Sequence, residues 1–151
     1  MRPRAATPAD VPALVALGEA AYARYVPRLD GREPPAMRPD FAEHIAEGAV
    51  RVVDGADGIE AYLIAYTQDG ALVIENVAVA PGRQGAGRGR GLLAFAEDLA
   101  RARGLGRLRL YTNVVMTENQ RLYARLGYAE TGRSTFGAGF ERVHYEKSLR
   151  E

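Results

Sequence analysis

The feature that most constrains this chain is a glycine-rich turn between a predicted strand and a predicted helix. Residues 71–80 are rich in β-branched side chains, which predicts a strand, and residues 85–103 carry an apolar stripe, which predicts a helix. Gly85, Gly87 and Gly89 let the backbone bend tightly and approach a ligand without Cβ obstruction. Phosphate oxygens are the natural partners of the free amides that begin a helix. The turn therefore predicts a phosphate-bearing ligand; the alternative is a tight turn without one.

Two common phosphate-binding motifs do not fit these glycines. A P-loop requires GxxxxGK[ST], and the only lysine of the chain is Lys147. A dinucleotide fingerprint requires GxGxxG, and Arg90 stands where its third glycine is needed. The spacing present is Gln84-x-x-Gly87-x-Gly89, after a strand that ends in Val-Ala-Pro.

Basic residues concentrate around the same turn. Residues 83–109 contain seven arginines and two acids, although the formal net charge of the chain is only +1. A local basic surface suits a polyanionic ligand, and a solvated helix face is the other interpretation. A nucleic-acid-binding domain is a competing hypothesis, but no reader motif or interleaved aromatic residue accompanies these arginines. We therefore predict no nucleic-acid partner.

The remaining pattern predicts a single mixed α/β domain over residues 1–151. The predicted helices are 7–25, 40–47, 85–103 and 117–126, and the predicted strands are 50–53, 59–67, 71–80, 107–113, 128–135 and 143–148. This order gives a central, mostly antiparallel twisted sheet with flanking helices and one helical crossover. The apolar pattern of the strand 71–80 changes phase near Glu75 and Asn76, which predicts a bulge.

Composition narrows the class of protein. A hydrophobic fraction of 47% and a charged fraction of 26% are typical of a soluble globular protein. No apolar run approaches the ~18–20 residues of a membrane span, and no secretory signal is evident, so we expect a cytoplasmic protein without a membrane partner. Cysteine is absent, and His44 and His144 lie far apart in sequence, so no metal is predicted. A homodimer is compatible with the sequence.

The glycine-rich turn and the residues after it resemble the N-acetyltransferases of the GNAT superfamily. The residues that carry the resemblance are Gln84, Gly87 and Gly89, which match the loop pattern (Arg/Gln)-x-x-Gly-x-(Gly/Ala), the stretch Gly91-Leu92-Leu93, and the segment 119–128. The resemblance implies acetyl-coenzyme A as co-substrate, no metal, and transfer of the acetyl group to a primary amine of a small molecule or peptide in a ternary complex. A non-catalytic acyl-coenzyme A-binding or sensor module is the alternative, and an acyl donor longer than acetyl is compatible.

The same resemblance implies which residues contact coenzyme A. They are Val77, Val79, Gln84, Gly85, Ala86, Gly87, Arg88, Gly89, Asn119 and Tyr123. The strand after the bulge is expected to offer free backbone groups to the pantetheine arm. The amide of Val79 or its neighbour is expected to stabilise the oxyanion of the thioester carbonyl. Asn119 and Tyr123 are four residues apart on one predicted helix and therefore share a face.

Two residues are predicted to move protons. Aminolysis of a thioester needs a proton removed from the amine and, ideally, a proton for the leaving thiolate. The resemblance implies Tyr123 as the general acid; the alternative is a core aromatic residue. Glu75 lies at the expected bulge in an otherwise apolar strand, so its carboxylate faces either the cleft or water. In the cleft it can deprotonate the amine through a water molecule.

The resemblance implies an acceptor pocket between the first two helices, their loop and the last strands. The predicted substrate-contacting residues are Tyr22, Tyr25, Arg133 and Phe136, and Arg28, Met37, His44 and Phe140 lie on the same segments. Aromatic side chains suit an apolar or aromatic acceptor, and Arg28 or Arg133 suits a carboxylate. Core packing is the alternative for the two tyrosines, and a structural or solvated residue is the alternative for His44.

Overall fold

The computed structural model describes residues 2–137 and 139–149, and its strands form one seven-stranded sheet in the order β1-β2-β3-β4-β5-β7-β6. The strands are β1 (Arg4–Ala5), β2 (Val50–Gly55), β3 (Gly58–Gln68), β4 (Ala71–Val79), β5 (Arg107–Asn113), β6 (Ala129–Phe136) and β7 (Phe140–Ser148). The pair β4–β5 is parallel and the other neighbouring pairs are antiparallel, as the predicted crossover requires. The mixed, mostly antiparallel fold class is confirmed.

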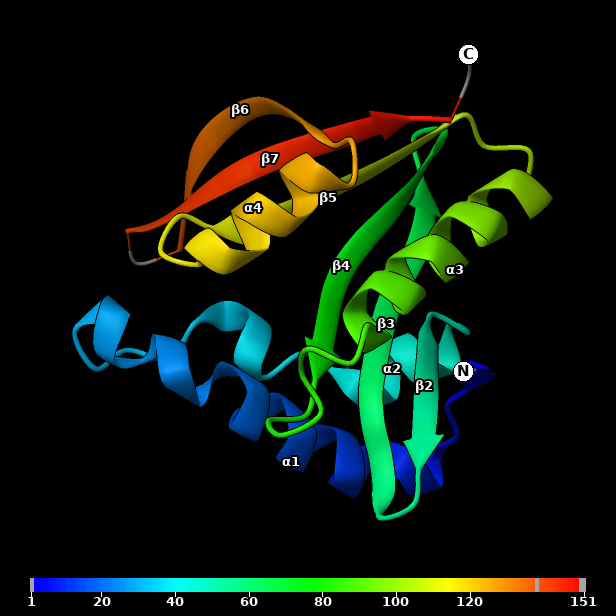
Figure 1. The fold of residues 1–151 in the computed structure, drawn as a ribbon, viewed down its shortest axis with the longest axis vertical. Coiled ribbons are helices and arrows are strands. Elements are labelled where there is room, and N and C mark those ends of the chain that lie inside the picture. Colours follow the sequence, from blue (N-terminus) through cyan, green and yellow to red (C-terminus); the bar gives the residue numbers. More distant parts are fainter. Residues whose placement is uncertain (1, 138, 150–151) are drawn as a thin grey trace.

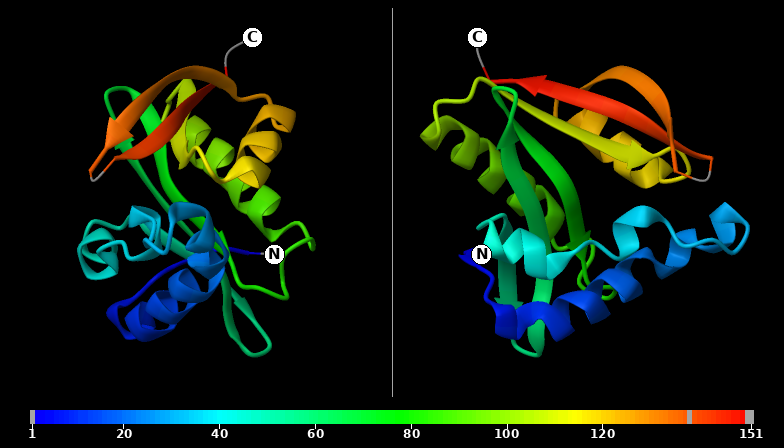
Figure 2. Two further views of the ribbon diagram at one scale, coloured as in Figure 1. Left: turned by 90° about the vertical axis from the view of Figure 1, so that its left-hand side faces the viewer. Right: turned by 180° about the vertical axis from the view of Figure 1, so that it is seen from behind.

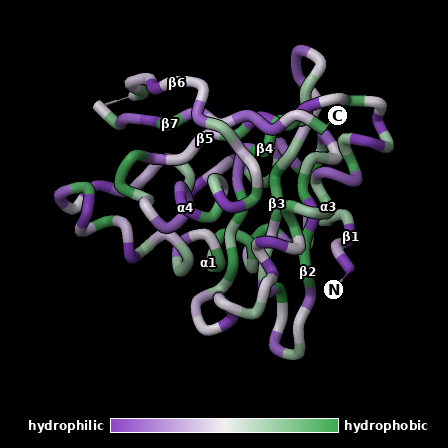
Figure 3. Tube along the Cα trace, turned by 45° about the horizontal axis from the view of Figure 1, so that its top comes forward, coloured by the Kyte–Doolittle hydropathy of each residue, from purple (hydrophilic) through white to green (hydrophobic). Residues whose placement is uncertain are grey.

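Helices cover both faces of the sheet (Figures 1 and 2). They are α1 (Val11–Tyr22), α2 (Phe41–Ala46), α3 (Arg88–Ala102) and α4 (Thr117–Arg125). Neighbouring residues of β3 point to opposite faces of the sheet. Leu63 packs in one hydrophobic cluster with Leu93 of α3, whereas Ile64 packs in a second cluster with Leu14 of α1. All four side chains are buried, and the hydrophobic colouring of β2 and β3 in Figure 3 follows this two-sided burial.

The sheet opens between β4 and β5. These two strands pair only from Leu72 to Ile74 on β4, and they then diverge, which Figure 1 shows as a wedge between the two halves of the sheet. On the other edge of β4, Ile64 faces Asn76 and Ala65 faces Ile74, so Glu75 is the extra residue of a bulge. The bulge predicted from the change of phase is therefore confirmed.

The structure differs from the sequence prediction at several boundaries. Helix α3 begins at Arg88 rather than at residue 85, because Gly85 and Gly87 have φ of 86° and 81°, in the left-handed region. Strand β1 escaped prediction because two residues show no periodicity, and residues 27–39 contain short 3₁₀ turns at Pro27–Leu29 and Pro35–Met37. Among the described residues, no helix combines the length and the apolar character needed to cross a membrane.

Candidate functional site

Two cavities adjoin the diverging end of β4. The first has a volume of about 560 Å³ and lies between α1, β4, the glycine-rich turn, α3 and α4. The second has a volume of about 320 Å³ and lies between β4, β5, residues 34–39 and the β6–β7 hairpin. Four residues line both cavities: Tyr22, Val77, Asn119 and Tyr123. The two spaces therefore meet at one shared wall.

The glycine-rich turn forms one end of the first cavity. Gly85, Gly87 and Gly89 line the cavity, as does Gln84, whose side-chain amide donates to the Val79 carbonyl at 3.3 Å. A Cβ built on Gly85 or Gly87 meets nothing within 4 Å, so the left-handed backbone, and not crowding, is what requires glycine there. Gly87 is the N-cap of α3, which leaves the first amides of this helix without helical partners.

Arginines surround this end of the cavity. The buried carboxylate of Glu60 pairs with Arg88, and also with Arg83 at 3.3 Å, so one acid orients both loop arginines. Arg90 and Arg125 also line the cavity, and neither pairs with a carboxylate of residues 2–137 or 139–149. Arg125 lies on α4, far from the loop in sequence, so no local motif could have associated it with the turn.

Backbone amides line the cavity where β4 leaves β5. The amide of Ala80 donates to the carbonyl of Glu60 on β3 at 2.8 Å. Because alternate residues of a strand direct their backbone groups to opposite sides, the amides of Val77 and Val79 point away from β3, toward the space that β5 has vacated. The sequence placed Val77 and Val79 in the donor site, and both line the first cavity. Ala86, also predicted there, lines neither cavity.

Tyr123 stands in the wall that the cavities share. Its ring is buried and packs against the rings of Tyr128 and Tyr145, each with a centroid separation of 5.8 Å. Its hydroxyl makes no hydrogen bond with the described residues. Burial raises the pKa of Tyr123 well above its usual value, so the phenol keeps its proton and can act as a donor.

Glu75 lines the second cavity, where two neighbours hold its carboxylate. The hydroxyl of Tyr66 donates to Oε1 at 2.9 Å, and Nε2 of His44 lies 2.8 Å from Oε2. The His44 ring is stacked on the Tyr66 ring, with an interplanar angle of 7°. Burial, and then the hydrogen bond to Glu75, raise the pKa of Tyr66, which keeps this hydroxyl a donor. His44 lines neither cavity; it supports Glu75 instead.

Asn76 connects the bulge to two segments that lie on the other side of the second cavity. Its side chain, only 4% exposed, accepts from the Tyr22 hydroxyl at 2.6 Å and donates to the Ala36 carbonyl at 2.8 Å. Asn76 thereby connects α1 and the 35–37 turn to β4. Sequence reasoning used this residue only to locate the phase change, although a polar side chain within an apolar strand was itself a signal.

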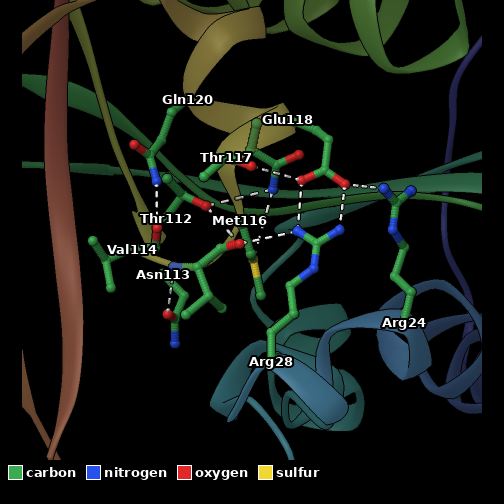
Figure 4. Close-up of polar contacts among 11 residues, drawn as sticks. Arg24, Arg28, Thr112, Asn113, Val114, Met116, Thr117, Glu118 and Gln120 are labelled. Carbon is green, nitrogen blue, oxygen red and sulfur yellow. Dashed lines mark hydrogen bonds and ion pairs between the residues drawn. The ribbon is translucent and has the colours of Figure 1, made fainter.

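A charged clamp connects the segment after α1 to the start of α4 (Figure 4). Arg28 donates to both carboxylate oxygens of Glu118, at 2.7 and 2.9 Å, and to the Val115 carbonyl at 3.0 Å. Arg24 contacts the same carboxylate. These hydrogen bonds, above all those of Arg28, hold the pKa of Glu118 well below its usual value. Arg28, predicted to bind an acceptor carboxylate, is therefore engaged within the protein and lines neither cavity.

The other predicted substrate residues divide between the cavities. Tyr22 lines both, and Phe136 lines the second, as does Phe140. Tyr25 lines only the first cavity. Arg133 lies on the exposed strand β6, where it pairs with Glu130 at 3.4 Å, and it lines neither. Tyr25 and Arg133 thus make no contribution to the second cavity, because strand and helix geometry direct them elsewhere. Its wall also includes Tyr111 and Arg142, two residues that the sequence analysis did not assign to the acceptor pocket.

A family model and a sequence relative both match this chain, and both are acetyltransferases. Residues 19–128 match the model of the Acetyltransferase (GNAT) family. A streptothricin acetyltransferase from Streptomyces lavendulae is 39% identical over 90 residues, which are 58% of this chain and 48% of the relative. The matched region thus spans about half the length of that relative.

Two solved structures resemble the fold across nearly the whole chain. A ribosomal-protein alanine N-acetyltransferase from Escherichia coli has a TM-score of 0.78 at 20% identity, covering 99% of this chain and 94% of that chain. A PaiA N-acetyltransferase from Thermoplasma acidophilum in complex with coenzyme A has a TM-score of 0.78 at 12% identity, covering 97% and 98%. At these identities the likeness concerns the fold.

Proposed function

The chain belongs to the acetyltransferase (GNAT) family, and on that premise we propose that it transfers an acetyl group from acetyl-coenzyme A to a primary amine of a small molecule or peptide. The single observation that carries the proposal is the shared wall between the two cavities. One cavity offers amides and arginines, which suit a polyanionic donor, and the other offers the carboxylate of Glu75, which suits an amine. Both substrates then meet at Tyr123, and the amine attacks the donor directly.

The first cavity fits coenzyme A in its chemistry. The turn at residues 84–89 and the free amides that begin α3 suit the pyrophosphate, and Arg90 and Arg125 supply cations for its phosphates. The free amides of Val77 and Val79 suit the pantetheine arm, and Asn119 reaches the same wall from α4. A structural relative was solved in complex with coenzyme A, which supports this assignment.

The reaction needs the proton movements that Glu75 and Tyr123 are suited to make. Acetyl-coenzyme A supplies a thioester carbonyl and a thiolate leaving group. Glu75, directly or through a water molecule, accepts the proton that makes the acceptor amine nucleophilic. The amide of Val79 or of Val77 stabilises negative charge on the carbonyl oxygen. The new carbon–nitrogen bond forms, the carbon–sulfur bond breaks, and Tyr123 gives its phenolic proton to the sulfur. The nitrogen, which is positively charged in the adduct, gives its second proton to the Tyr123 phenolate, so the amide product is neutral and the phenol is restored.

One assay distinguishes the proposed activity from two alternatives, a non-catalytic binding module and an enzyme that uses a longer acyl donor. Purified protein is incubated with acetyl-coenzyme A and panels of amino acids, polyamines, aminoglycosides and peptides, and free thiol is measured over time. We expect thiol release that depends on one class of amine. Coenzyme A binding by calorimetry without release for any amine would favour a non-catalytic binding module. Faster release from propionyl- or butyryl-coenzyme A would assign a longer acyl donor.

A further inference from the structure

We propose that the acceptor is an amine that also carries a carboxylate, as a free amino acid does, and that Arg142 binds this carboxylate. The inference rests on the proposed function, since it assigns the substrate class of the second cavity. It narrows the acceptor from amines in general to amino carboxylates, and it names a specificity-determining residue on β7.

Charged side chains are scarce in the second cavity. Among its described lining residues, only Glu75 and Arg142 carry a charge at neutral pH. Most of the remaining wall is apolar or aromatic, with Pro34, Pro35, Pro39, Ile74, Met116, Phe136 and Phe140. A polycationic acceptor needs several carboxylates, whereas this cavity offers one, and Arg142 would repel a second ammonium group. A zwitterion matches the one negative and one positive wall residue.

Arg142 is held between two aromatic rings. Strand β7 lies between β5 and β6, and Arg142 sits opposite Asn113 on β5 and Ser134 on β6. Its Cζ lies 3.9 Å from the ring centroid of Tyr111 on β5 and 3.4 Å from that of Phe136 on β6. Arg142 also donates a side-chain hydrogen bond to Tyr111, and a guanidinium has five N–H donors, so others remain for a ligand. That planar set of donors matches the two oxygens of a carboxylate.

Within the described residues, the Arg142 side chain has no acidic partner. Arginines on neighbouring strands pair within the protein, Arg107 with Glu146 and Arg133 with Glu130. No carboxylate of residues 2–137 or 139–149 lies within ion-pair distance of Arg142. A partly buried guanidinium without an anion favours a ligand that supplies one.

The two charged residues stand on different strands of the diverging sheet. Glu75 projects from β4 beside the shared wall, whereas Arg142 projects from β7, beyond β5. An amino carboxylate can therefore place its amine toward Glu75 and Tyr123 and its carboxylate toward Arg142. Pro35 and Phe140 line the same cavity and offer an apolar surface to the rest of the acceptor.

The experiment compares acceptors that differ only in the carboxylate. Wild-type protein, Arg142→Met and Arg142→Lys are assayed by thiol release with α-amino acids, ω-amino acids, the matching carboxamides and diamines. Arg101→Met, an exposed arginine on α3 that lines neither cavity, is the matched control. Binding of the best amino acid to protein saturated with coenzyme A is measured by calorimetry, and melting temperatures report folding.

We expect wild-type protein to prefer an amino acid over its carboxamide. Arg142→Met should raise KM and Kd for that amino acid about 10- to 100-fold, the loss expected for charge-assisted hydrogen bonds, with little change in kcat. KM for the carboxamide should stay within twofold, and Arg142→Lys should recover part of the loss. Equal or better turnover of diamines or carboxamides by wild-type protein would overturn this inference alone. Absence of turnover with every amine would overturn the proposed function and this inference together.

Discussion

The two cavities share a wall but are built in different ways. The first depends largely on backbone: the left-handed glycines of one turn, the free amides that begin α3, and the free amides of β4. The second depends on side chains from segments far apart in the sequence, at residues 34–39, 74–77, 111–116 and the β6–β7 hairpin. A site made mainly of backbone groups keeps its binding groups when neighbouring side chains are substituted. A site made of side chains from distant segments loses or gains a binding group with each substitution.

The largest expected effect is at the wall that both cavities share. Tyr123→Phe removes the phenolic proton and keeps the buried ring, so kcat should fall about 10²- to 10⁴-fold while Kd for coenzyme A stays within twofold. Thiol release and calorimetry measure the two quantities. Tyr128→Phe is the control, because the Tyr128 hydroxyl is buried without a hydrogen-bond partner among the described residues. Unchanged turnover in Tyr123→Phe would remove this residue from the mechanism.

The next effect should be confined to the second cavity. Glu75→Gln keeps an oxygen that can accept from Tyr66 but loses the basic carboxylate, so kcat/KM for the acceptor should fall by about 10²-fold. KM for acetyl-coenzyme A should not change. Glu146→Gln, another carboxylate of the sheet that lines neither cavity, provides the comparison in the same thiol-release assay. A raised KM for acetyl-coenzyme A in Glu75→Gln, together with a lowered melting temperature, would indicate a structural role instead.

A backbone change should act on the first cavity alone. Gly87→Ala forces an L side chain into the left-handed region at φ 81°, which costs about 1–2 kcal/mol, so KM for acetyl-coenzyme A should rise about 5- to 30-fold. KM for the acceptor should be unaffected. Gly104→Ala imposes the same strain at φ 70° beyond the C-terminus of α3, away from both cavities. It should lower the melting temperature and leave both KM values unchanged; a rise in KM there would mean that strain anywhere on α3 is sufficient.

The smallest effect concerns how the acceptor side is attached to β4. Tyr22→Phe removes the hydrogen bond to Asn76 and leaves a buried amide oxygen without its donor, so unfolding free energy should fall by about 1–2 kcal/mol. Urea unfolding measures the change. Tyr62→Phe should be nearly neutral, because the buried Tyr62 hydroxyl has no partner among the described residues. Similar losses in the two variants would show that the Asn76 bond adds little.

The difference between the cavities explains how much of the molecule the sequence could predict. The turn at Gln84–Gly89 and the bulge at Glu75 follow from local patterns, because glycine spacing and strand phase are properties of neighbouring residues. The start of α3 was placed three residues early, since apolar periodicity cannot reveal the left-handed conformation of Gly85 and Gly87. The expectation of one domain over residues 1–151 stays a prediction.

The acceptor side was harder to predict because its contacts are distant in sequence. His44 and Glu75 meet across 31 positions of the chain, and the supporting role of His44 depends on the packing of α2 on the sheet. Arg28 and Arg133 were reasonable carboxylate ligands by residue type. Arg28 pairs instead with Glu118, which only the fold brings near it, and Arg133 pairs with Glu130 on the exposed strand β6. Arg142 has the same residue type and a different environment, which is set by rings from β5 and β6.

Because Glu75 is an extra residue in β4, the number of residues in this strand determines which side chains beyond the bulge face α3. Before the bulge, Leu72 and Ile74 pack on the α3 side; after it, Val77 and Val79 do so, which is a change from even to odd positions. A substitution in this strand alters one contact. Deletion of Glu75 would remove the bulge and leave Val77 and Val79 on the α3 side, because the strand would then alternate regularly, and it would favour continued pairing with β5. An insertion, or a deletion that leaves the bulge in place, would exchange the inward and outward side chains of the residues beyond it. Insertions and deletions here should therefore be tolerated far less than substitutions.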